Sequence, residues 1–213
     1  MYFDYKKPIK KSPLYPVGKY LSNFLAPFVY DISCFGQENI PPEGPLIIAC
    51  NHISFSDPAV IIANCPRRVC YMAKSELFQK RCWALLMKSM NAFPVKRDFA
   101  DRNAVRYAQK VIDEGFALGI FPEGRTVEEL IPARAKNGVA YISYKTGADV
   151  LPVCLYRNPN DKRKRHSLVL RFGEVIENNS LFHGDKSRSE DIKKGADTIM
   201  DEIKRMWEEE RCR

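Results

Sequence analysis

Short, almost wholly apolar runs alternate along this chain with stretches in which apolar residues recur every three or four positions. The first pattern predicts buried strands and the second predicts amphipathic helices. The predicted strands are residues 46–50, 69–73, 93–95, 117–121, 149–156 and 167–172. The predicted helices begin near residues 58, 77, 101, 136 and 187. This alternation predicts an α/β domain with a central, largely parallel sheet flanked by helices. Pro152, inside one predicted strand, requires an edge, a bulge or a strand start.

The N-terminal segment departs from this pattern. Lysines 6, 7, 10 and 11 precede a stretch whose apolar positions, from Val17 to Leu25, predict an amphipathic helix that Pro27 ends or kinks. The charge-free run over residues 20–30 is too short to span a bilayer. Either this helix lies in the interface of an anionic membrane, or it packs on the domain with its lysines solvated. We divide the chain into an amphipathic segment, residues 1–35, and a main domain, residues 36–213.

Charge and cysteine content narrow the classes of partner. The net charge of +8 over 213 residues favours anionic partners: a phosphate-bearing substrate, a membrane surface or nucleic acid. The seven cysteines are scattered without Cys-x-x-Cys spacing, which indicates reduced thiols in a cytoplasmic setting. The three histidines lie far apart, so we expect no metal site.

His52 and Asp57 form the first candidate site. His52 follows the run 46–50, which places it on a loop at the carboxyl end of a strand, where open α/β sheets bind their ligands. Asp57 and Pro58 predict the start of the next helix. The loop between them allows the Asp57 carboxylate to turn back toward the His52 imidazole. Such a pair suits a general base and the carboxylate that orients it.

Lys96 and Arg97 follow the predicted strand 93–95. The Arg97 guanidinium can hold a phosphate with two hydrogen bonds, whereas Lys96 offers only a point charge. A surface pair facing water is the alternative. The position at a strand end favours Arg97 as a phosphate ligand.

The run 117–121 ends in Pro-Glu-Gly-Arg-Thr. Gly124 permits a tight turn whose backbone amides face a ligand, and Arg125 adds a fixed charge. The Thr126 hydroxyl offers one more donor. Glu123 either accepts a hydrogen bond from a polyol hydroxyl or holds the arginines in place. A simple turn with a surface ion pair is the alternative.

Four segments in order resemble the motifs of the glycerolipid acyltransferases, the family that includes 1-acylglycerol-3-phosphate acyltransferase. They are Asn-His-x-x-x-x-Asp, the run ending at Arg97, Phe-Pro-Glu-Gly-Arg-Thr, and Leu-Pro-Val at residues 151–153. The third motif is commonly Phe-Pro-Glu-Gly-Thr-Arg-Ser. Here Arg125 and Thr126 stand in exchanged order and Val127 replaces the serine, so either of the two can take the phosphate-facing place.

The resemblance implies a mixed-sheet acyltransferase domain whose site gathers along one edge of the sheet. It also implies transfer of a fatty acyl group from acyl-coenzyme A or acyl carrier protein to the sn-2 hydroxyl of 1-acylglycerol-3-phosphate, giving phosphatidic acid. Glycerol-3-phosphate and other lysolipids stay open as acceptors, and the donor is undecided. We expect no cofactor besides the donor. We place the enzyme at the cytoplasmic face of a membrane, peripheral or monotopic, without a spanning helix.

In this mechanism His52 removes the proton of the acceptor hydroxyl and Asp57 orients the imidazole. Cys50 lies in the apolar run, so we expect it to pack as a small hydrophobe and not to carry an acyl group. For Trp83, in an apolar stretch, an ordinary core position is favoured over an acyl-chain tunnel.

Two other classes of protein fit part of the pattern. A thioester hydrolase would use the same His52–Asp57 pair on water. A non-enzymatic basic protein would bind membrane or nucleic acid through its charge. That second class leaves the polar residues at the strand ends without a role, and we expect no nucleic-acid partner.

Overall fold

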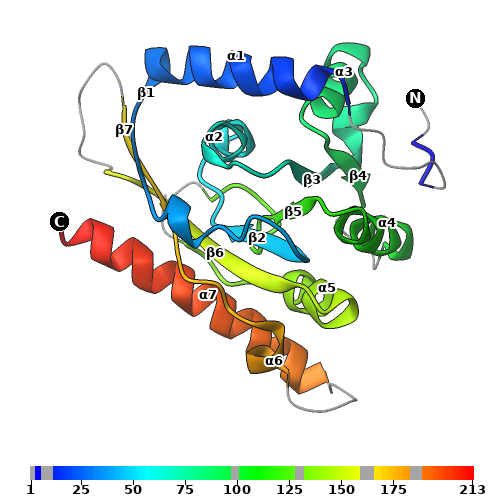
Figure 1. The fold of residues 1–213 in the computed structure, drawn as a ribbon, viewed down its shortest axis with the longest axis vertical. Coiled ribbons are helices and arrows are strands. Elements are labelled where there is room, and N and C mark those ends of the chain that lie inside the picture. Colours follow the sequence, from blue (N-terminus) through cyan, green and yellow to red (C-terminus); the bar gives the residue numbers. More distant parts are fainter. Residues whose placement is uncertain (1–2, 6–11, 97–100, 128–131, 159–165, 183–188) are drawn as a thin grey trace.

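The computed structural model describes residues 3–5, 12–96, 101–127, 132–158, 166–182 and 189–213, which form a seven-stranded sheet with helices on both faces (Figure 1). The strands are β1 (Tyr30–Phe35), β2 (Leu46–Cys50), β3 (Val69–Lys74), β4 (Phe93–Val95), β5 (Ala117–Ile120), β6 (Asp149–Arg157) and β7 (His166–Phe172). The α-helices are α1 (Leu14–Val29), α2 (Asp57–Asn64), α3 (Arg81–Ser89), α4 (Arg102–Asp113), α5 (Gly138–Thr146), α6 (Asn178–Leu181) and α7 (Ser189–Arg211).

The strand order is β1-β7-β6-β2-β5-β3-β4. Neighbouring strands are parallel, except that β6 and β7 are antiparallel. The mixed, largely parallel sheet and the α/β class are therefore confirmed. β2 lies between β6 and β5, so its carboxyl end opens onto the middle of one sheet edge.

The sheet separates two layers of helices. Alternate residues of β2 face opposite layers: Ile48 and Cys50 pack in the core beneath α1 and α2, whereas Ile47 and Ala49 pack with α4, α5 and α7. Burial on both faces explains why the sequence of this strand is a continuous apolar run and does not alternate. Figure 1 shows α1, α2 and α3 on one side of the sheet and α5 and α7 on the other.

The N-terminal region differs from the expectation in two ways. α1 continues through Pro27 to Val29, so this proline does not end the helix, which was one of the two effects predicted for it. A proline this close to the helix end removes one intrahelical hydrogen bond, and the Tyr30 N–H then closes the helix by donating to the Ala26 carbonyl. β1 was not predicted as a strand, and it joins the edge of the sheet beside β7. The lysines at 6, 7, 10 and 11 lie outside the described residues.

Pro152 lies within an interior strand, at a β-bulge, which was one of the three positions expected for it. Val150 bridges Ile176, and Val153 pairs with Phe172. Over this interval β6 advances by three residues and its partner by four, so the partner carries one extra residue. The missing N–H of Pro152 therefore falls where the ladder is already interrupted.

No helix in the described part of the chain is both long and apolar enough to cross a bilayer.

Candidate active site

Two neighbouring parallel strands deliver the candidate residues to one edge of the sheet. β2 and β5 pair in register as far as Ala49 and Ile120. His52 follows the end of β2, and residues 121–127 follow the end of β5. Because parallel strands end at the same edge, the two loops meet. We call residues 52–57 the histidine loop and residues 121–127 the glycine loop.

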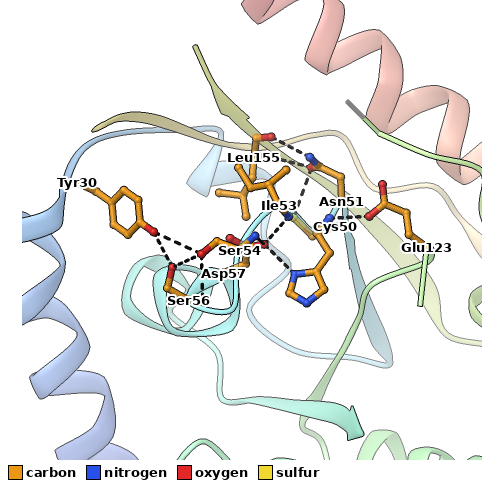
Figure 2. Close-up of polar contacts among 10 residues, drawn as sticks. Tyr30, Cys50, Asn51, Ile53, Ser54, Ser56, Asp57, Glu123 and Leu155 are labelled. Atoms are coloured by element: carbon orange, nitrogen blue, oxygen red, sulfur yellow. Dashed lines mark hydrogen bonds and ion pairs between the residues drawn. The ribbon is translucent and has the colours of Figure 1, made fainter. Parts of the chain in front are cut away.

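The imidazole of His52 is bonded to the carboxylate of Asp57. His52 Nδ1 lies 2.8 Å from Asp57 Oδ2. The same oxygen accepts the backbone N–H groups of Ile53, at 2.7 Å, and Ser54, at 2.8 Å (Figure 2). Asp57 is 1% exposed and His52 is 9% exposed. Since a carboxylate only accepts, Nδ1 carries the proton, and Nε2 keeps a lone pair that can take a proton from a substrate.

The backbone of His52 is held at both its N–H and its carbonyl by the glycine loop. The His52 N–H donates to Glu123 Oε2 at 2.8 Å, and the Val127 N–H donates to the His52 carbonyl at 2.8 Å. Glu123 Oε1 accepts the Ala133 N–H, also at 2.8 Å. Burial raises the pKa of the Glu123 carboxyl, and these two backbone donors oppose that rise. Glu123 thus joins the histidine loop to the segment that contains Ala133, although the two are far apart in sequence.

Asn51 fixes the exit of the chain from β2. Its amide donates to the Leu155 carbonyl and accepts the Leu155 N–H, both at 2.8 Å (Figure 2). The side chain is fully buried, and its amide bonds to the backbone of β6 as a neighbouring strand would. This pairing sets the direction in which the next residue, His52, leaves the sheet.

Two aromatic rings form a stack with the imidazole. The His52 and Phe121 rings lie 4.0 Å apart at 18°, and Phe121 and Tyr71 lie 5.6 Å apart at 16°. A Cβ at Gly119 would come within 2.3 Å of the Tyr71 ring, so only glycine leaves room for this ring over β5. Phe121 had been assigned to the end of a strand, and Tyr71 to the interior of one. The pattern of apolar residues carried no signal for their ring contacts.

A cluster of three hydroxyls ties the histidine loop to the start of β1. The Tyr30 hydroxyl lies 2.8 Å from the Ser56 hydroxyl, which lies 2.9 Å from that of Ser54 (Figure 2). Tyr30 directly follows α1, so the cluster links that helix to the loop. No local sequence pattern marks Tyr30 as part of the site.

The residues expected to bind phosphate lie toward solvent. Arg125 and Thr126 are exposed, and Gly124 has a φ of 71°, a left-handed conformation that side chains disfavour. The structure thus places Gly124, Arg125 and Thr126 on the loop that holds His52. Arg97 lies outside the described residues, and Lys96 at the end of β4 is exposed.

The Cys50 thiol is buried at the end of β2. Burial raises its pKa well above the ordinary value, so the group is a thiol and a poor nucleophile. Among the described residues, no group of three or more His, Cys, Asp or Glu side chains is placed to hold a metal ion.

The buried His52–Asp57 pair at this edge of the sheet suits an acyl-transfer enzyme. The chain belongs to the acyltransferase family, whose model matches residues 31–156, a region that includes both loops.

Within this family the chain is similar to proteins named 1-acyl-sn-glycerol-3-phosphate acyltransferase. It is 29% identical to the one from Bacillus subtilis (strain 168) over 156 residues, which cover 71% of this chain and 77% of that protein. It is 32% identical over 132 residues to the one from Borreliella burgdorferi, covering 59% of this chain and 51% of that protein.

The fold also matches a solved structure. The crystal structure of the 1-acyl-sn-glycerophosphate (LPA) acyltransferase PlsC from Thermotoga maritima superposes with a TM-score of 0.70 at 24% identity. The match covers 94% of this chain and 79% of that one, so the shared fold extends beyond the family region.

Proposed function

We propose that this enzyme transfers a fatty acyl group from a thioester donor to the sn-2 hydroxyl of 1-acylglycerol-3-phosphate, giving phosphatidic acid. The observation that carries the proposal is the buried His52–Asp57 pair beside the glycine loop, at the carboxyl edge of the sheet. The names of the Bacillus and Borreliella relatives support this acceptor.

In the proposed reaction, His52 Nε2 removes the proton of the acceptor hydroxyl as its oxygen attacks the thioester carbonyl. The tetrahedral intermediate collapses, the carbon–sulfur bond breaks, and the imidazolium returns the proton to the departing thiolate. Asp57 keeps the proton on Nδ1 and stabilises the imidazolium. General-base assistance of this kind contributes about 10²–10⁴ in rate. A thioester is already activated, so the reaction needs neither a cofactor nor a nucleophilic side chain.

The acceptor phosphate is assigned to the cations of this edge. Arg125 is exposed on the loop that holds His52, and Thr126 adds an exposed hydroxyl. We include Arg97 from its place in the second motif. Glu123 is given a different role from the one expected of it: because both its oxygens accept backbone N–H groups, it acts by positioning His52.

We further propose that α1, within the N-terminal segment 1–35, and α3 rest on an anionic membrane surface at the cytoplasmic face. α1 exposes Val17, Tyr20, Phe24 and Phe28, and α3 exposes Trp83 beside Leu85 and Leu86. The prediction that Trp83 lies in the core is wrong. The Trp83 ring contacts Phe55 of the histidine loop, with centroids 5.3 Å apart, so the apolar surface reaches the active site.

Cations border this apolar surface. Lys80 and Arg81 are exposed at the start of α3. Apolar and aromatic side chains flanked by cations suit the interface of an anionic bilayer. A lysolipid held in that bilayer would then reach His52 along the surface that carries Phe55.

The test is the release of free thiol from an acyl thioester by the purified protein, with and without 1-acylglycerol-3-phosphate in anionic vesicles. We expect release that depends on the acceptor, and a loss of about 10²–10⁴ in rate for His52→Ala. Equal release without acceptor would identify a thioester hydrolase. No release with either donor, on this acceptor, glycerol-3-phosphate or other lysolipids, would refute the proposal.

A further inference from the structure

A groove with a volume of about 1180 Å³ runs between α4 and α5. Its floor is apolar and includes Met72 of β3, Val95 of β4 and Ile120 of β5. Its inner end contains Phe121, whose ring stacks on His52. The groove therefore starts at the candidate base and leads away from it. No step of the proposed mechanism yet uses it.

Cations border the groove on both sides. The five exposed cations that line it are Lys96, Arg102, Arg106, Lys136 and Lys145. None of them forms an ion pair with another residue in the part of the chain that the structure describes. Asp101 is the acidic residue among the described lining residues. Its carboxylate already accepts three backbone N–H groups, those of Lys96, Asn103 and Ala104, at the start of α4. The groove thus has a cationic border and an apolar floor.

The two ends of the groove differ. At the inner end, the Lys136 side chain crosses the glycine loop, where a Cβ at Gly124 would meet it at 3.1 Å. At the outer end, Tyr141 is 41% exposed, and Lys145 Nζ lies 5.9 Å from the centroid of its ring. An exposed aromatic ring beside a cation can stack a nucleobase and hold a phosphate at the same time.

The groove and the apolar surface lie on opposite faces of the sheet. α4 and α5 pack into one core cluster, and α1 and α2 pack into the other (Figure 1). His52 lies at the edge between them. A lipid that arrives along α1 and α3 would leave the groove free for a ligand that comes from solution.

We propose that this groove binds the donor as a coenzyme A thioester. The pantetheine arm would lie along the apolar floor with its thioester near Phe121. The phosphates would contact the cations of α4 and α5, and the adenine would stack on Tyr141. The inference rests on the proposed acyl transfer and adds to it the identity of the donor and the side from which it enters.

Charge and shape favour coenzyme A over a carrier protein. Charge-assisted hydrogen bonds from guanidinium and ammonium groups suit several phosphates arranged along one chain. A carrier protein presents one phosphate at the root of the same arm and no nucleobase. The exposed ring of Tyr141 would then have no partner.

The first experiment measures binding without turnover. Coenzyme A is titrated calorimetrically into the full chain and into Arg106→Gln, Lys145→Gln and the matched control Lys194→Gln. Lys194 is exposed on α7 and does not line the groove. We expect each groove variant to raise the Kd about tenfold, the equivalent of one charge-assisted contact, and the control to match the wild type. Absence of binding, or equal Kd values in all four proteins, would overturn the assignment.

The second experiment measures turnover with two donors, palmitoyl-coenzyme A and palmitoyl-pantetheine, which lacks the phosphates. We expect the preference of the wild type for the coenzyme A thioester to fall about tenfold in Arg106→Gln and Lys145→Gln. The KM for 1-acylglycerol-3-phosphate should stay unchanged. An unchanged preference would refute the assignment of the groove to coenzyme A. Turnover of an acyl carrier protein thioester that coenzyme A does not inhibit would refute it as well. Coenzyme A binding without acylation of any acceptor would refute the proposed function and leave the groove assignment standing.

Discussion

The two loops that meet at His52 are built in opposite ways. In the histidine loop the polar side chains bond inward: Asp57 accepts three N–H groups through one oxygen, and Ser56 bonds to both Tyr30 and Ser54. In the glycine loop, Glu123 and Val127 bond to the backbone of His52. Its middle presents Arg125 and Thr126 to solvent.

This difference suggests that the histidine loop serves catalysis and the glycine loop serves substrate binding. A general base must be held within a narrow geometry before the substrate arrives, and buried hydrogen bonds supply that order. A side chain that binds phosphate must give up its water when the substrate arrives. An exposed arginine can do this at little cost. Changes in the histidine loop and at Glu123 should therefore lower kcat, whereas changes at Arg125 should raise KM.

Among the changes that leave the His52 side chain in place, the largest effect is expected for Asp57→Asn. An asparagine can offer its single carbonyl oxygen to these N–H groups. In the flipped orientation its NH₂ group would face them and could not accept. His52 then loses the partner that keeps the proton on Nδ1, so kcat should fall about 10³–10⁴-fold. Steady-state thiol release measures this, with exposed Asp113→Asn on α4 as the matched control. A fall of less than about tenfold would show that the carboxylate does not orient the base.

Next in size is Glu123→Gln, which tests whether the glycine loop positions the base. Glutamine accepts only one of the two backbone N–H groups and turns an NH₂ group toward the other. We expect kcat to fall about 10–100-fold with little change in either KM, because the displaced group is the backbone of His52. Exposed Glu114→Gln serves as the control. A higher KM for the acceptor at unchanged kcat would instead assign Glu123 to a hydroxyl of the acceptor.

A smaller effect on binding is expected for Arg125→Gln. Loss of a charge-assisted contact should raise the KM for 1-acylglycerol-3-phosphate about tenfold and leave kcat nearly unchanged. Thr126→Val should raise it only about twofold, since a neutral hydrogen bond in water contributes less. Initial rates over a range of acceptor concentrations decide between them. The reverse order would give Thr126 the phosphate-facing place that the exchanged motif left open.

The sequence allowed the prediction of those parts of the site that depend on local order. His52 and Asp57 are five residues apart, and a strand end and a helix start fix them both. The contacts of Glu123 with His52, and of Asn51 with Leu155, join residues 71 and 104 positions apart. No local pattern encodes such pairs, because they depend on which strands become neighbours.

The same reasoning explains the differences in the fold. β1 is a short strand at an edge, and its alternating burial gave no continuous apolar run of the kind that identified β2. Trp83 is of a residue type that is usually buried, yet its side chain is exposed and contacts Phe55. Composition cannot distinguish a core helix from a helix with an exposed apolar face.

The smallest effects come from two tyrosine hydroxyls near the histidine loop. The Tyr71 hydroxyl is buried without a hydrogen-bond partner among the described residues, and burial raises its pKa well above the ordinary value. The Tyr30 hydroxyl bonds to Ser56 at 2.8 Å. Each hydroxyl can be deleted by phenylalanine with the ring retained, so the two variants form a matched pair.

Tyr71→Phe removes an unpaired polar group and should raise the free energy of unfolding by about 1 kcal/mol. Tyr30→Phe removes a paired one and should lower it by about 1 kcal/mol. Urea denaturation measures both. Because Tyr30 follows α1 and reaches the loop that holds Asp57, its loss should also lower kcat about threefold, on the scale of one neutral hydrogen bond, whereas Tyr71→Phe should leave kcat unchanged. Equal kcat in both variants would confine the hydroxyl cluster to stability and separate it from the geometry of the base.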